Sequence, residues 1–153
     1  MSLMNRPQWH AQVKEDALEP SQPIIDAHHH LWAPPLPRYL AGDILEDIGQ
    51  GHNIRATVYV DSFCGYHSSG PEVLRPVGEI EFALKQAKLA NQLQESEGKG
   101  CEVNAAVIGH VDMLAGEKVS QALDAMIETG QDRFRGVRHT AAWDASDGLR
   151  NSH

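Results

Sequence analysis

Short apolar runs rich in β-branched residues alternate along the chain with longer segments whose apolar residues recur at helical spacing. The short runs predict four strands, over residues 23–28, 54–61, 102–111 and 134–139. The periodic segments predict a weak helix and two longer ones, over residues 43–50, 79–96 and 116–129. Strands that alternate with helices in this way predict an α/β fold with a parallel sheet.

The spacing of the predicted strands narrows the fold further. Their centres lie about 30 to 50 residues apart, and βα units of about 30 residues build a (β/α)8 TIM barrel of roughly 250 residues. The chain has 153 residues, so we expect the N-terminal half of such a barrel, about four βα units, truncated after strand four. This part spans 23–153 and follows a polar leader over 1–22. One explanation for the second methionine, Met4, is a short cloning scar.

Charge and composition exclude several classes of protein. The chain carries 13 Lys and Arg against 21 Asp and Glu, a formal net charge of −8, which argues against a surface for nucleic acid or an anionic membrane. No run approaches the roughly 20 apolar residues of a membrane span, and the leader has no apolar core of a signal peptide. Two cysteines imply no disulfide framework. We therefore expect a cytoplasmic protein with a small-molecule substrate.

The candidate chemistry lies in a histidine-rich segment, Asp26-Ala27-His28-His29-His30-Leu31-Trp32. Alternate residues of a strand face the same way, so His28 and His30 share a face about 7 Å apart and both imidazoles can bind one ion, whereas His29 points towards a helix. The chain has 9 histidines, so the spacing alone is weak evidence. Its place at the end of an apolar strand favours metal ligands for Zn²⁺ or a similar ion. Asp26, on the same side, either anchors an imidazole or makes a structural hydrogen bond.

This segment resembles the opening motif of the amidohydrolase superfamily, and more narrowly of the amidohydrolase 2 (amidohydrolase-related) family of metal-dependent TIM-barrel hydrolases. That family reads Asp-x-His-x-His followed by an apolar residue and often Trp. Weaker similarities are the segments 58–61 and 135–139, and the resemblance covers about residues 24–143. It implies a divalent metal, foremost zinc, held by His28 and His30. Some lactonase-like relatives use these histidines without a bound metal.

The resemblance implies hydrolysis of a lactone, or of a related ester or amide, in a small carboxylated molecule, by a metal-activated water. A decarboxylase of the same family is the alternative. The family also takes a His from strand five, often one from strand six, and an Asp after strand eight. These residues are absent from the sequence, so the catalytic set is incomplete in this chain.

Three further residues are candidates for substrate binding, each with a structural alternative. Asp61 ends the second strand and either contacts metal or substrate or begins the next loop. Arg138, near the end of the fourth strand, either grips a substrate carboxylate or forms a salt bridge at the barrel rim. Trp32 either lines the pocket or packs. His110 and His139 are interpreted as polar residues of the rim.

A non-catalytic interpretation also fits the sequence. Half a barrel leaves two sheet edges and one wall of the interior unpaired, and burying them requires a partner. The chain would then be a truncated fragment that binds metal weakly and self-associates. On either interpretation we expect a homo-oligomer.

Overall fold

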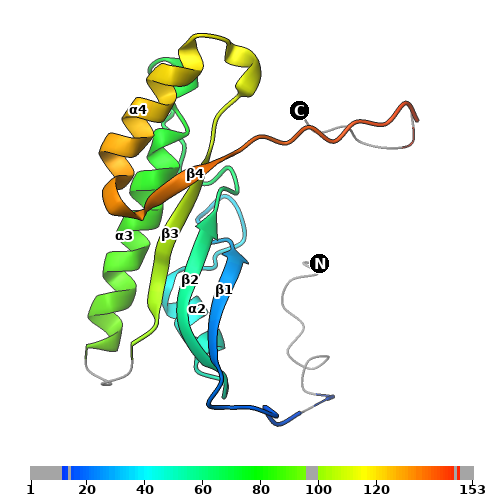
Figure 1. Ribbon diagram of the computed structural model, residues 1–153, viewed down its shortest axis with the longest axis vertical. Helices are drawn as coiled ribbons and strands as arrows, with labels where there is room; N and C mark the ends of the chain where they lie inside the picture. Colours follow the sequence, from blue (N-terminus) through cyan, green and yellow to red (C-terminus); the bar gives the residue numbers. More distant parts are fainter. Residues whose placement is uncertain (1–11, 14, 96–99, 147, 149–153) are drawn as a thin grey trace.

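Four parallel strands form the sheet at the centre of the structure (Figure 1). The structure is a computed structural model that describes residues 12–13, 15–95, 100–146 and 148. The strands lie side by side in their order along the chain: β1 (Pro23–His29), β2 (Asn53–Val60), β3 (Glu102–His110) and β4 (Phe134–Arg138). The predicted α/β fold with a parallel sheet is confirmed at this level. Of the leader, 1–11 and 14 lie outside the described residues, and so does the interpretation of Met4.

Three helices connect the strands, namely α2 (Ala41–Ile48), α3 (Val77–Gln94) and α4 (Lys118–Gly130). Single 3₁₀ turns, η1 (Glu72–Leu74), η2 (Met113–Ala115) and η3 (Gln131–Arg133), precede α3 and flank α4. Each predicted strand and helix lies within two residues of its observed bounds, because the runs and periodicities that predict them are local. α4 ends at Gly130, and the residue after it, Gln131, has a positive φ of 47°.

The helices cover one face of the sheet and share a single core with it (Figure 1). α3 lies between α2 and α4 and packs on β3. Its small buried residues, such as Ala83 and Ala90, let the helix approach the strands closely. The sheet and the other helices contribute larger apolar side chains to the same cluster, among them Tyr59, Val103, Val107, Ile44 and Met126.

The other face of the sheet is not covered by these helices. Ile25 of β1 is 65% exposed, and Val58 and Ile108 on the same face are half-buried. β1 and β4 are the edge strands of the described sheet. Within the described residues no helix is long and apolar enough to cross a membrane.

Candidate functional site

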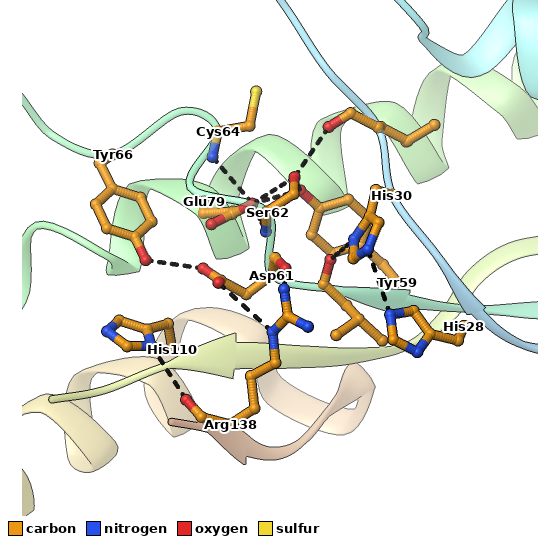
Figure 2. Close-up of polar contacts among 12 residues, drawn as sticks. His28, His30, Tyr59, Asp61, Ser62, Cys64, Tyr66, Glu79, His110 and Arg138 are labelled. Atoms are coloured by element: carbon orange, nitrogen blue, oxygen red, sulfur yellow. Dashed lines mark hydrogen bonds and ion pairs between the residues drawn. The ribbon is translucent and has the colours of Figure 1, made fainter. Parts of the chain in front are cut away.

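Two imidazoles meet where β1 ends (Figure 2). The Nε2 atoms of His28 and His30 lie 3.3 Å apart, and the rings stand edge to face at 87°. His28 is exposed and His30 half-buried, at the carboxyl edge of the sheet, where parallel α/β proteins bind their ligands. The predicted convergence of the two rings on one face is confirmed.

The backbone carbonyl of Val60 fixes the tautomer of His30. The Nδ1 atom of His30 lies 2.7 Å from the oxygen of Val60. A carbonyl only accepts hydrogen bonds, so Nδ1 carries the proton and Nε2 turns a lone pair towards His28. Metal-binding histidines usually donate their second N–H to a carbonyl or carboxylate in this way. The backbone oxygen of Val60 therefore orients the His30 ring so that its Nε2 lone pair faces His28.

A bulge in β1 lies between Asp26 and His29 and so includes His28. Asp26 pairs with Thr57 and His29 pairs with Tyr59, so three steps along β1 match two along β2. His29 lies on the helix-covered side, as predicted, with its Nε2 2.9 Å from Oγ1 of Thr57. The prediction that Asp26 shares the face of His28 and His30 was wrong, because it assumed unbroken alternation.

The residues around the pair support it through backbone contacts and ring packing. The carboxylate of Asp26 accepts a hydrogen bond from the backbone N–H of His28 at 3.1 Å, so it acts on the main chain. The indole of Trp32 lies 5.8 Å from the ring of His30 and is held by two backbone hydrogen bonds with Tyr39. Trp32 thus flanks the imidazoles, where a pocket wall was expected.

Asp61, directly after β2, is buried and already partnered. Only 1% of it is exposed, and its Oδ1 accepts the hydroxyl hydrogen of Tyr66 at 2.8 Å. Its Oδ2 lies 3.8 Å from Nε of Arg138, and an Nη2–H of Arg138 donates to the backbone oxygen of Asp61. The Arg138 side chain remains 37% exposed. Asp61 therefore holds Arg138 at the rim, and of the two only Arg138 offers an exposed group to a ligand.

A second buried carboxyl, Glu79 in the first turn of α3, was missed by sequence reasoning. Its Oε1 accepts hydrogen bonds from the Tyr59 hydroxyl at 2.6 Å, from Ser62 N at 2.8 Å and from Cys64 N at 3.1 Å (Figure 2). Burial, followed by the neighbouring Asp61 carboxylate, raises the pKa of Glu79 well above its ordinary value. A signal was present, because Glu79 falls at helical spacing from the small apolar residue Ala83.

His110, the last residue of β3, repeats the contact seen at His30. Its Nδ1 lies 3.1 Å from the backbone oxygen of Arg138, so it too carries a proton on Nδ1. Its ring packs against Phe63 and His139, at centroid distances of 5.4 and 6.0 Å. A cavity of about 540 Å³ adjoins these rings and is lined in part by Tyr66, Arg75, His110 and Lys118. This volume suits a small molecule.

The described residues bring together two imidazoles, which is fewer than the ligand set of a complete metal site. Among them no group of three His, Cys, Asp or Glu side chains is arranged to hold one. A catalytic zinc takes three protein ligands and a water, so His28 and His30 fit as two of the three. Comparisons with models of protein families, with curated proteins and with solved structures found no match for this chain.

Proposed function

We propose that this chain forms the N-terminal half of a (β/α)8-barrel hydrolase of the amidohydrolase 2 type, acting on a lactone or related ester of a small carboxylated molecule. The strand order supports the barrel. Doubly wound sheets reverse their order at a switch point and carry helices on both faces. Here β1 to β4 follow the chain order without reversal, and the helices share one face, which is the arrangement of a barrel wall.

The distance between the two imidazoles carries the functional proposal. Zn–N bonds of about 2.0–2.1 Å at a tetrahedral angle place two ligand nitrogens about 3.3–3.4 Å apart. The Nε2 atoms of His28 and His30 are 3.3 Å apart, and the proton on Nδ1 of His30 leaves its Nε2 free to bind. Without a metal, the same distance fits a hydrogen bond from Nε2–H of His28 to His30.

The position of each side chain in the proposed site indicates its role. A bound divalent metal supplies an acidified water and polarises the substrate carbonyl. His28 and His30 hold and orient that metal. The exposed part of Arg138 binds a substrate carboxylate and so orients the substrate, while Trp32 shields one side of the imidazoles. The resemblance assigns the proton acceptor to a later strand that these 153 residues do not include, so turnover requires that group from elsewhere.

A zinc titration tests the metal site directly. We expect the chain to bind Zn²⁺ by isothermal titration calorimetry, and His28→Ala and His30→Ala each to abolish that binding. His52→Ala is the matched control, because His52 is exposed and precedes β2 at the opposite edge of the sheet. Binding that survives both site variants, or that is lost in the control, contradicts the proposal. With the missing half supplied, release of a hydroxy acid identifies a lactonase, and release of carbon dioxide a decarboxylase.

The uncovered sheet face favours a second candidate, a fragment that self-associates. Ile25 of the edge strand β1 is 65% exposed on that face, and β1 and β4 have open edges within the described sheet. In a dimer, the edge strands of one copy would pair with those of the other. We expect light scattering after size-exclusion chromatography to show a homo-oligomer that Ile25→Glu weakens. Leu114→Glu, at a 78% exposed position in η2, should leave it intact, and a monomeric wild-type chain would refute this candidate.

A further inference from the structure

The carboxyl groups of Asp61 and Glu79 are both buried, and each has one oxygen without a hydrogen-bond donor among the described residues. These oxygens are Oδ2 of Asp61 and Oε2 of Glu79. Ser62, the residue after Asp61, donates its backbone N–H to Glu79 at 2.8 Å, and Figure 2 shows the two carboxyl groups side by side. The Asp61 carboxylate is accordingly one cause of the raised pKa of Glu79. Two ionised carboxylates in such a place would repel each other without solvent to screen them.

A single proton shared by the two carboxyl groups would remove this repulsion. The other two carboxyl oxygens already have donors, since Oε1 of Glu79 accepts from Tyr59 and from backbone N–H groups of the loop after β2, and Oδ1 of Asp61 accepts from Tyr66. Placed on Oε2 of Glu79, a proton donates to Oδ2 of Asp61 and satisfies both buried atoms. It also leaves one carboxylate against one guanidinium, so the buried cluster with Arg138 is neutral.

We propose that Glu79 and Asp61 form a carboxylic acid–carboxylate pair that shares one proton, and that Glu79 acts through Asp61 as a positioning residue for Arg138. Asp61 connects Glu79 to Arg138, because its carboxylate forms an ion pair with the guanidinium at 3.8 Å and its backbone oxygen accepts a hydrogen bond from it. The role of Arg138 as an anion-binding group rests on the proposed function. The shared proton does not.

The other titratable groups around the pair do not change charge near neutral pH. Burial raises the pKa of Tyr59, Tyr66 and Cys64, so all three stay protonated. Arg138 keeps its charge. His110, which contacts the backbone oxygen of Arg138, is an imidazole and gives no carboxyl signal. A change at a carboxyl carbon between neutral and mildly alkaline pH therefore distinguishes the pair from these neighbours.

The proton can be observed in the wild-type chain, with no substitution that risks unfolding. In protein labelled with ¹³C at the Glu side-chain carboxyl, we expect one carboxyl carbon with the shift of a neutral acid at pH 7. It should disappear in Glu79→Gln and persist in Glu46→Gln, a control at an exposed position of α2. A spectrum in which every Glu carboxyl is ionised at pH 7 overturns the proposal.

The dependence of folding stability on pH gives a second test of the shared proton. The pKa of Glu79 is higher in the folded chain than in the unfolded one, so its stabilisation is complete below the unfolded pKa and is lost as pH rises through the folded pKa. Within that window the folding equilibrium constant falls by up to about tenfold per pH unit. Urea unfolding should show this fall in wild type and in Glu46→Gln. Glu79→Gln, which carries a permanent N–H donor, should lack it, and equal slopes in all three proteins refute the pair.

The positioning of Arg138 is read from its Nε–H signal in a ¹⁵N spectrum during titration with propionate. We expect the propionate response of wild type to be retained in Glu79→Gln and weakened several-fold in Glu79→Ala. Equal responses in Glu79→Ala and wild type would show that Glu79 does not position Arg138. Loss of zinc binding or turnover would refute the hydrolase and leave the proton readouts unchanged, so the two proposals fail separately.

Discussion

Gly78, the second residue of α3, lies against the loop that follows β2 and begins with Asp61. A Cβ atom added there would lie 2.4 Å from the backbone oxygen of Gly65 and 2.9 Å from the backbone nitrogen of His67. Both are main-chain atoms and cannot turn aside as a flexible side chain could. The Gly78→Ala variant must therefore push the loop away from the helix, and with it Tyr66, whose hydroxyl bonds Asp61.

The size of the effect follows from two opposing terms. Overpacking a tightly packed site costs about 1–3 kcal/mol, whereas replacing glycine by alanine within a helix gains up to about 1 kcal/mol. Gly42 provides the matched control, because it is the second residue of α2 and its added Cβ would meet nothing within 4 Å. The helical gain is common to both variants, so we expect Gly78→Ala to be about 1–3 kcal/mol less stable than Gly42→Ala.

Urea unfolding followed by circular dichroism measures this difference. Gly42→Ala should unfold at the same urea concentration as wild type or a higher one, and Gly78→Ala at a lower one. The Tyr66 ring signals in an NMR spectrum should shift only in Gly78→Ala. Equal stability of the two variants would refute the close contact between α3 and the loop, and an unshifted Tyr66 would refute its link to the site.

Three further predictions concern other parts of the chain. Burial lowers the pKa of His29 from 6.5, so wild type should lose stability as pH falls below about 6.5 and His29→Gln should lose less, as urea unfolding at pH 5 and pH 7.5 will show. Gln94→Ala should lower the free energy of unfolding by about 1–3 kcal/mol in thermal melts, because the Gln94 amide bonds both N–H and C=O of Cys101. Tyr66→Phe should cost a similar amount, about 1–3 kcal/mol, since it removes the donor to the buried Oδ1 of Asp61.

Local pattern accounts for what the sequence predicts well. The strands and helices follow from runs and periodicities within each segment, and the convergence of His28 and His30 follows from their spacing of two. The bulge in β1 does not, because it depends on how β1 pairs with β2. It reversed the side predicted for Asp26 while leaving the two imidazoles on a common face.

The long-range polar contacts could not be predicted from the sequence either, because they depend on how separate segments pack together. Arg138 meets Asp61 across 77 positions of the chain, and either residue taken alone fits a solvated rim. Glu79 was not singled out from the sequence, because its helical spacing from Ala83 does not show that the loop after β2 folds over it. Burial of a charged group is a property of the assembled layers rather than of the segment.

The contact between His30 and Val60 has an evolutionary consequence. Its acceptor belongs to the main chain, so any amino acid at position 60 that keeps the strand paired still supplies it. The same holds for His110 and position 138. A change of side chain at position 60 or 138 would therefore leave both ring contacts in place, so any constraint on position 138 comes from the contacts of the Arg138 side chain itself. A search for co-varying partners of His30 would find none at position 60.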